Sequence, residues 1–223
     1  MKVLIITGGN IDIDFALDFL KKDKWDHIIA VDSGLNAVDT MLKRHPGCLR
    51  ISHLVGDFDS VDGNILEKFR SLPDVAVHTF NPVKDLTDTD IAMEIALDLC
   101  RKGDAIYLLG ATGTRIDHML ANIHVLRRAL EAGVEAYLVD SLNKIYLQRG
   151  IRTIEKTGQF GKFVSILPAG DEISGVFLRG FKYPLNNARI CFGSSLGISN
   201  EILEDKGVVE IGHGTAIVFE VDE

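Results

Sequence analysis

Two aspartates separated by one residue, Asp57 and Asp59, are the clearest candidates for metal chemistry in this chain of 223 residues. They follow a short apolar run typical of a buried strand, and Phe58 lies between them. In an extended segment residues i and i+2 point the same way, so both carboxylates would face one side while Phe58 turns into the core. Mg²⁺ takes such hard oxygen ligands together with phosphate oxygens of a substrate. The spacing also fits a solvated aspartate-rich turn that caps the next helix.

A second acidic group surrounds the predicted start of a helix. Thr87 and Asp90 have the spacing of a capping box, and the apolar residues that follow recur at helical intervals. Asp88 then lies in the first turn, where the helix dipole favours an ionised carboxylate. We interpret Asp90 as a capping residue only. We assign Asp85 and Asp88 to a functional site, because Lys84 adds a cation at the same strand end.

The third cluster, Arg115, Asp117 and His118, follows the glycine-containing loop Gly110–Gly113 at the predicted start of another helix. A glycine loop, an arginine and a helix N-terminus together suit a nucleoside triphosphate. The arginine fork can neutralise charge on a transferring phosphoryl group, and Asp117 could orient that arginine or bind ribose hydroxyls. The loop lacks the Gly-Lys-Ser/Thr ending of a P-loop, which excludes that class of site.

These clusters meet only if the strands before them form one sheet. Six short apolar runs in the first 142 residues alternate with helical patterns, which predicts a doubly wound, mostly parallel α/β domain with buried strands. In such sheets ligands bind at the carboxyl ends of the strands. Gly8-Gly9 follows the first strand, as a tight turn or as a close approach to phosphate. The predicted strands are Val3–Ile6, Ile28–Val31, His53–Val55, Val75–Phe80, Ala105–Leu109 and Ala136–Val139.

The pattern changes in residues 143–223, where short strand-like runs are separated by glycines and no long helical stretch occurs. We predict a smaller, all-β, sandwich-like domain. Its core would be thin, so it is expected to pack on the first domain or on a partner subunit. Its predicted strands are Lys144–Gln148, Lys162–Leu167, Gly175–Leu178, Arg189–Phe192, Val208–Ile211 and Ala216–Val221.

Composition excludes several classes of protein. The 24 basic and 32 acidic side chains give a net charge of -8, and the absence of a basic patch argues against nucleic-acid binding. Three cysteines without a Cys-x-x-Cys pair indicate neither a disulfide framework nor a zinc knuckle, which favours the cytoplasm. No apolar run approaches the length of a membrane span, so we expect no membrane association.

The order of the motifs resembles the bacterial thiamine pyrophosphokinases over almost the whole chain. The loop often reads Gly-Ala-Thr-Gly-Gly-Arg in that family, whereas Thr114 here replaces the second of the paired glycines. The resemblance rests on Val31-Asp-Ser-Gly-Leu-Asn36, Gly56-Asp-Phe-Asp-Ser60, Lys84-Asp-Leu-Thr-Asp88, Gly110-Ala-Thr-Gly-Thr-Arg-Ile-Asp-His118, Leu120-Ala-Asn122 and Ser199-Asn-Glu201.

The resemblance implies transfer of the pyrophosphoryl group of ATP to the hydroxyl of thiamine, which gives thiamine diphosphate and AMP. It implies a homodimer with active sites at the subunit interface. It also implies Mg²⁺ at Asp57, Asp59 and Asp88, and thiamine at Ser199 and Asn200, although Ser-Asn-Glu could equally be a turn that packs the dimer. The catalytic group comprises Asp57, Asp59, Asp85, Asp88 and Arg115, and the ATP contacts are Gly9, Asp32, Ser33, Ser60, Lys84, Thr87, Arg115, Asp117 and His118.

Two other functions remain compatible with the residues. A Mg²⁺-dependent phosphotransferase acting on another alcohol would use the same aspartates, and an ordinary kinase would release ADP in place of AMP. A nucleotide- or thiamine-binding regulatory protein without turnover is the second alternative. A base for the thiamine hydroxyl is not identifiable, with Asp59 and Asp85 as candidates.

Overall fold

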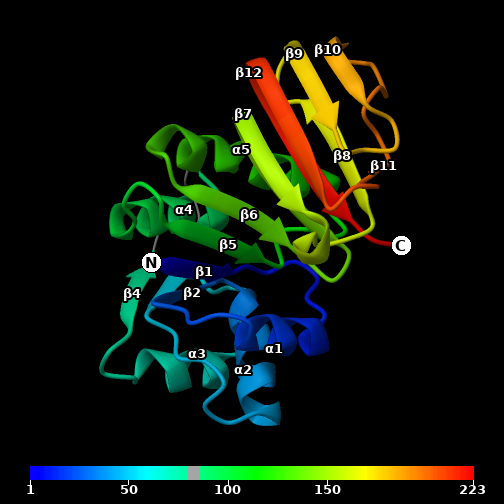
Figure 1. The fold of residues 1–223 in the computed structure, drawn as a ribbon. Coiled ribbons are helices and arrows are strands. Elements are labelled where there is room, and N and C mark those ends of the chain that lie inside the picture. The colour runs from blue at the N-terminus through cyan, green and yellow to red at the C-terminus, as the bar shows by residue number, and fades with distance from the viewer. Residues whose placement is uncertain (80–85) are drawn as a thin grey trace. The chain divides into compact units, whose positions relative to one another are not determined.

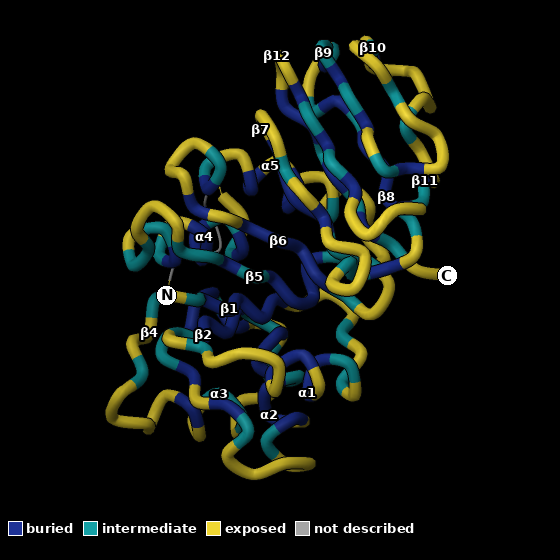
Figure 2. The backbone as a smooth tube through the Cα atoms, viewed as in Figure 1, coloured by how far each residue is buried: buried dark blue, intermediate teal, exposed yellow. Residues whose placement is uncertain are grey.

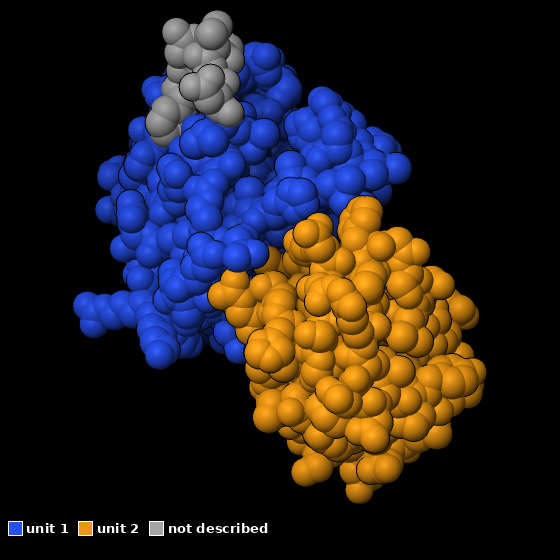
Figure 3. All heavy atoms as spheres, turned by 90° about the horizontal axis from the view of Figure 1, so that it is seen from above, with its two compact units in different colours: residues 1–141 blue, residues 142–223 orange. Residues whose placement is uncertain are grey.

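The computed structural model describes residues 1–79 and 86–223, which form two compact units, 1–141 (unit 1) and 142–223 (unit 2) (Figure 3). Unit 1 alternates strands and helices, and unit 2 consists almost entirely of strands. The predicted order, a parallel α/β part followed by a β-rich part, is confirmed. Two predicted site residues, Lys84 and Asp85, lie outside the described residues.

Unit 1 contains a sheet in the order β6-β5-β1-β2-β3-β4, and every pairing within it is parallel. The near-continuous apolar runs of its central strands are buried, as expected for a sheet covered on both faces (Figure 2). The strand β4 lies at the edge and is mostly exposed. The strands are β1 (Lys2–Ile6), β2 (His27–Val31), β3 (His53–Gly56), β4 (Ala76–Thr79), β5 (Ala105–Leu109) and β6 (Glu135–Val139).

The helices of unit 1 cover the two faces of this sheet. From β1 the chain steps to β2, β3 and β4 in one direction, and it then returns to place β5 and β6 on the other side of β1. Because such crossovers are right-handed, α1, α2 and α3 cover one face and α4 and α5 the other (Figure 1). The direction reverses between β1 and β5, where a doubly wound sheet offers a binding crevice. The helices are α1 (Ile13–Lys21), α2 (Gly34–Arg44), α3 (Gly63–Arg70), α4 (Asp88–Leu99) and α5 (Ile116–Ala132).

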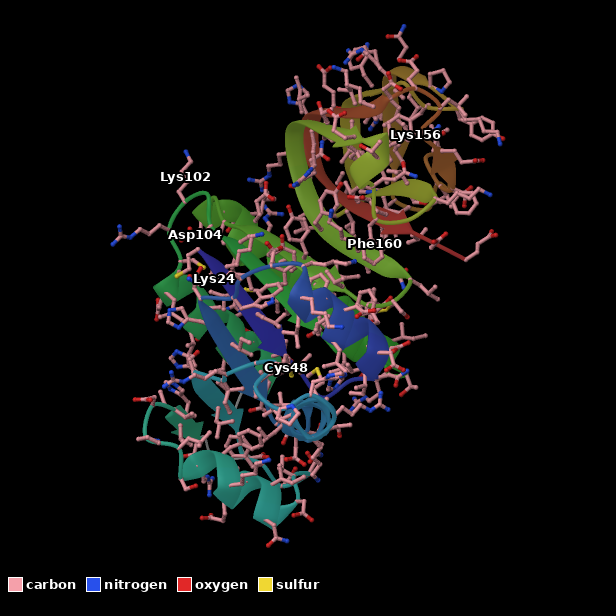
Figure 4. All side chains as sticks on the ribbon, turned by 60° about the horizontal axis from the view of Figure 1, so that its bottom comes forward. Lys24, Cys48, Lys102, Asp104, Lys156 and Phe160 are labelled. Atoms are coloured by element: carbon pink, nitrogen blue, oxygen red, sulfur yellow. The ribbon has the colours of Figure 1, made fainter. Side chains whose placement is uncertain are left out.

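At the amino-terminal edge of the sheet, an ion pair ties down the start of the chain. The amine of Met1 lies 2.7 Å from Asp104, which shares with Lys102 the loop that precedes β5 (Figure 4). The ring of Trp25 packs nearby between Phe19 of α1 and Tyr107 of β5, with ring centroids 5.4 and 5.3 Å away. These contacts hold the amino-terminal ends of the strands together.

Unit 2 is organised around one long strand. β12 pairs antiparallel with β7 along its length, with β9 on its first half and with β8 on its second half. Two separate strands, Val208–Ile211 and Ala216–Val221, were predicted where this single strand runs, and that prediction is wrong. A register shift between Ile211 and Ala216, with Gly214 at φ 88°, lets the strand bend without ending. The strands are β7 (Asn143–Glu155), β8 (Phe163–Pro168), β9 (Glu172–Arg179), β10 (Leu185–Cys191), β11 (Asn200–Glu201) and β12 (Lys206–Val221).

A buried carboxylate, that of Glu220, connects segments of unit 2 that are distant in sequence. Glu220 of β12 accepts hydrogen bonds from Lys144 Nζ at 3.1 Å and from the backbone N–H of Phe160 at 2.8 Å. The two bonds compensate for removing the carboxylate from water.

Among the helices of the described ranges, none has the length and apolar character needed to cross a membrane.

Candidate active site

A cleft of about 690 Å³ opens in unit 1 at the carboxyl ends of β1, β2 and β5. The starts of α4 and α5 complete its walls, so it lies at the reversal point of the sheet. The sheet order brings these strand ends together. Side chains that are up to about half the chain apart in sequence therefore lie in one cleft. The predicted site residues that line the cleft are Gly9, Asp32, Ser33, Thr87, Asp88, Arg115 and His118.

Two glycines allow the loops after β1 and β5 to cross. The N–H of Gly9 donates to the carbonyl of Gly110 at 3.0 Å, and a Cβ on Gly9 would lie only 2.1 Å from that oxygen. Gly110 has φ 74°, and a Cβ there would lie 2.3 Å from the carbonyl oxygen of Thr7. Larger residues would separate the loops. The wall of the cleft is consequently bare backbone, which lets a phosphate approach closely.

Three carboxylates converge beside the cleft. Asp32, Asp57 and Asp59 each offer an oxygen within 4.8 Å of the oxygens of the other two. Asp32 follows β2 and the other two follow β3, so the parallel pairing of these strands creates the cluster. The hydroxyl of Ser60 donates to Asp32 Oδ2 at 2.8 Å and fixes its orientation. An all-oxygen donor set of this kind fits a hard divalent cation such as Mg²⁺.

The pKa of Asp32 is raised by its surroundings. Burial raises this pKa, and the carboxylates of Asp88 and Asp57 raise it further. Hydrogen bonds from the Ser60 hydroxyl and the Ser33 backbone act in the opposite direction. Negative charges therefore crowd at this edge, and a bound cation would relieve their repulsion. Asp88 acts on Asp32 from the start of α4 but is not one of the three grouped carboxylates.

The backbone at Phe58 differs from the extended form that the spacing predicted. Phe58 is buried, as expected, but its φ of 62° places it in the left-handed region. The segment is thus a tight turn, and the N–H of Asp59 donates to Asp57 Oδ1 at 3.2 Å. The two carboxylates share a side because the chain turns between them. Burial of the ring anchors this strained turn.

The start of α4 confirms Thr87 as the predicted N-cap. The N–H of Asp90 donates to Thr87 Oγ1 at 3.2 Å, and the Asp90 carboxylate pairs with Arg128 of α5. This ion pair supports a structural role for Asp90. Thr89, one position earlier, shares a buried hydrogen bond of 2.8 Å with Thr7 at the end of β1. Sequence reasoning did not identify this contact, because no spacing pattern links two threonines so far apart in the chain.

Arg115 and Asp117 form an exposed pair at the start of α5. The Arg115 Nη2 lies 2.7 Å from Asp117 Oδ2, and the hydrogen bond from Arg115 lowers the pKa of Asp117. Of the two roles suggested by the sequence for Asp117, orientation of Arg115 is the one visible in this geometry. The neighbouring Thr114 has no positive φ, so a threonine is accommodated where the family often has glycine. Asn122, which lines the cleft, donates to the Ala111 carbonyl at 2.8 Å and supports the loop.

The predicted thiamine residues lie in unit 2 and differ in exposure. Asn200 is buried, and its side chain bonds the backbone of Tyr183 through both its oxygen (3.0 Å) and its nitrogen (2.7 Å). Ser199 is exposed and has φ 55°. The carboxamide of Asn200 thus ties β11 to the backbone at Tyr183. A role of Ser199 and Asn200 in thiamine binding stays a prediction.

Comparisons with known proteins support one family for both units. Residues 19–138 match the model described as "Thiamin pyrophosphokinase, catalytic domain", and residues 151–217 match "Thiamin pyrophosphokinase, vitamin B1 binding domain". The chain belongs to the thiamine pyrophosphokinase family. It is 35% identical over 165 residues to the thiamine pyrophosphokinase of Bacillus subtilis (strain 168), which covers 74% of this chain and 75% of the relative.

Solved structures of thiamine pyrophosphokinases share the fold. The protein from Bacillus subtilis aligns with a TM-score of 0.86 and 29% identity over 100% of both chains. The protein from Geobacillus thermodenitrificans aligns with a TM-score of 0.81 and 29% identity, over 100% of this chain and 98% of the other. As a member of this family, the chain is an ATP-dependent transferase that makes thiamine diphosphate and AMP, which confirms the predicted family and activity. Neither alternative function is favoured.

Proposed function

We propose that the cleft of unit 1 binds the triphosphate of ATP, and that Asp32, Asp57 and Asp59, with Asp88 facing them, hold Mg²⁺ there. The convergence of three carboxylates beside a glycine-lined cleft is the observation that carries this proposal. When bound, Mg²⁺ would neutralise charge on the phosphate oxygens of ATP. Asp32 joins the set suggested by the family resemblance because its oxygens lie with those of Asp57 and Asp59.

The residues of the cleft position the triphosphate for attack. Arg115 offers a guanidinium fork at the start of α5. It is the N-cap residue of that helix, and its side chain makes no capping hydrogen bond to the first N–H groups. Those N–H groups and the positive end of the dipole favour a phosphate. Thr87 fixes the start of α4 and with it Asp88. Ser33 and His118 line the same cleft, where they suit contacts to the nucleotide.

The reaction follows from this placement. The hydroxyl oxygen of thiamine attacks the β-phosphorus of ATP, and a bond forms between them. The bond from the β-phosphorus to the oxygen bridging the α-phosphate breaks, so AMP leaves with that electron pair while the hydroxyl proton passes to a base or to water. Positioning and charge neutralisation supply most of the catalysis in such transfers, and no covalent nucleophile is required. Asp59 is the described candidate for the base.

Unit 2 is proposed to contribute to thiamine binding. Its match to a model described as a vitamin B1 binding domain supports this role. We further propose a homodimer with active sites at the subunit interface. Large apolar side chains exposed on unit 2 support the dimer; they are Tyr183, Phe192, Leu196, Ile198 and Leu203. The net charge of -8 supports the prediction that nucleic acid is not a partner, and the cytoplasmic location stays a prediction.

Product analysis tests the proposed chemistry. Purified protein is incubated with ATP, thiamine and Mg²⁺, with a chelator in a parallel sample, and the products are resolved by chromatography. AMP and thiamine diphosphate are expected together, and only with the metal. ADP with thiamine monophosphate would contradict attack on the β-phosphorus. Equal turnover with the chelator would contradict the role of Mg²⁺.

A further inference from the structure

The loop after β5 is held at three successive residues, each by a different element. Two of the contacts are the hydrogen bonds accepted by the backbone carbonyls of Gly110 and Ala111. The third is made by a side chain, because Thr112 Oγ1 donates to Asp140 Oδ2 at 2.6 Å. The proposed phosphotransfer uses neither Thr112 nor Asp140.

The register of the sheet brings Asp140 to this loop. Leu109 pairs with Val139, so the parallel strands β5 and β6 end level with each other. Asp140 directly follows β6 and therefore lies beside the start of the loop, although it is 28 positions from Thr112 in sequence. The last four residues of β6 are buried, so Asp140 extends from a firmly packed strand end.

The hydroxyl of Thr112 is not directed to a substrate. The loop lines the cleft before and after this position, with Ala111 and Gly113, whereas Thr112 is not among the described residues of the lining. A hydroxyl has one proton to donate, and that of Thr112 goes to Asp140. Both side chains are partly buried. Thr112 and Asp140 are therefore placed to support the loop and not to contact the nucleotide.

This hydrogen bond is of a type that can hold a short loop in place. A hydroxyl that donates to a carboxylate forms one of the stronger hydrogen bonds, about 2.5–2.7 Å long, and the bond to Asp140 has such a length. The next three residues, from Gly113 to Arg115, are exposed. Thr112 is thus an anchor beside the exposed stretch that ends at Arg115.

We propose that Asp140 is a positioning residue for the pyrophosphoryl transfer, because through Thr112 it holds the loop in the conformation that presents Arg115 to the triphosphate. This proposal rests on the proposed function, in which Arg115 binds the triphosphate. A loop that is already ordered loses less conformational entropy when it binds ATP. It also keeps the guanidinium near its place in the transition state, where a displacement of about 1 Å can lower the rate about 100-fold.

Steady-state kinetics at saturating thiamine and Mg²⁺ test the role of the bond. Thr112→Val replaces the hydroxyl with a methyl group of similar size, and Asp140→Ala removes the acceptor, so each should lower kcat/KM for ATP about tenfold. Thr112→Ser keeps the hydroxyl and should stay within about threefold of wild type. The control is Asp104→Ala, which removes a carboxylate bound to the chain N-terminus at the other end of β5 and should leave kcat/KM within about twofold.

A double-mutant cycle with Arg115→Ala separates positioning from a general loss of stability. If the hydrogen bond acts through Arg115, Thr112→Val should lower kcat/KM less than about twofold once Arg115 is already alanine. Additive effects, with Arg115→Ala itself strongly impaired, would overturn the positioning role and leave the proposed function standing. Full activity of Arg115→Ala would contradict the proposed function, and this proposal with it.

The cycle is built on Thr112→Val, so it stays decisive if Asp140→Ala fails to fold. Circular dichroism and thermal unfolding check the fold of each variant. Wild-type kcat/KM in folded Thr112→Val, or a serine variant as impaired as the valine variant, would also overturn the proposal.

Discussion

At the scale of single residues, two aspartates two positions apart in α4 have different partners. Asp88 lines the cleft and acts on the pKa of Asp32, whereas Asp90 pairs with Arg128 of α5. We expect Asp88→Asn and Asp57→Asn each to lower the rate of AMP formation about 100-fold or more, because each removes charge that faces the Mg²⁺–phosphate complex. Steady-state assays with circular dichroism as a check on folding measure this effect.

The matched control for this prediction is Asp90→Asn. It removes the same charge from the same helical turn but acts on the α4–α5 contact, so the turnover number should stay within about threefold of wild type. Thermal stability should fall modestly, since a partly exposed ion pair contributes only about 0.2–1 kcal/mol. Near-wild-type activity of Asp57→Asn or Asp88→Asn, with unchanged circular dichroism, would remove that residue from the proposed site.

The guanidinium of Arg115 provides a second residue-scale test. Arg115→Lys keeps the positive charge but loses the planar fork that binds two phosphate oxygens at once. We expect kcat/KM for ATP to fall about tenfold or more, because a lost transition-state contact of this type is rarely replaced by a single ammonium group. Asp117→Asn should have a smaller effect, since it frees Arg115 without removing it. Equal activities of Arg115→Lys and wild type would contradict the proposed binding of phosphate by the guanidinium fork of Arg115.

Residue chemistry was predictable where it depends on local spacing. The pair Asp57 and Asp59 follows from the sequence alone, and the capping role of Thr87 does so as well. The grouping of Asp32 with that pair depends on the pairing of β2 with β3. The left-handed backbone at Asp32 (φ 44°) and Phe58 (φ 62°) was not predictable. Aspartate tolerates that region without requiring it, and phenylalanine enters it only where tertiary contacts hold it there.

At the scale of elements, Asp39 joins α2 to α3. Its side chain is buried and accepts from Lys68 Nζ of α3 at 2.6 Å, while Lys43 Nζ of its own helix lies 2.7 Å away. Burial acts to raise the pKa of Asp39, but the two ammonium groups outweigh it, so the pKa lies below its usual value. We expect Asp39→Asn to lower the free energy of unfolding by about 1–2 kcal/mol at pH 7, a value reduced for the exposure of both lysines.

The contribution of Asp39 to the free energy of unfolding depends on pH with a defined sign. A carboxylate whose pKa is lower in the folded state stabilises the fold above its unfolded-state pKa, and this contribution disappears as the pH falls through the folded-state pKa. The difference between wild type and Asp39→Asn should thus be constant from pH 7 to about 5, and it should shrink below about pH 4. Urea unfolding at several pH values measures it. A difference that grows in acid would show that Asp39 is not ionised in the fold.

Element boundaries were predicted to within a few residues wherever an apolar run ends in a glycine or an aspartate. β5 was predicted with its observed bounds, Ala105–Leu109. The strand β12 was divided in two because Gly212 and Gly214 resemble a turn, whereas pairing with β7 on both sides of these glycines keeps the strand continuous. Local sequence identifies a bend but not the partner strand that spans it.

At the scale of the whole molecule, the exposed apolar residues of unit 2 lead to a test of the proposed dimer. Phe192 is 82% exposed, and Leu196 and Ile198 of the following loop are 45% and 42% exposed. An exposed phenylalanine with apolar neighbours gains free energy when a partner covers it. We expect wild type to sediment as a dimer at micromolar concentration, and Phe192→Asp to shift it to a monomer, because a buried interface does not accept an unpaired charge.

Activity decides whether this dimer matters for function. If the active sites lie at the subunit interface, the specific activity of Phe192→Asp should fall with its dimer fraction, and it should recover partly at high protein concentration by mass action. Thr157→Asp adds the same charge at an exposed position of unit 2 without removing an apolar side chain, so it should remain dimeric and active. A Phe192→Asp monomer with full activity at every concentration would exclude an intersubunit site. The nucleotide, metal and thiamine sites would then have to be complete within one chain.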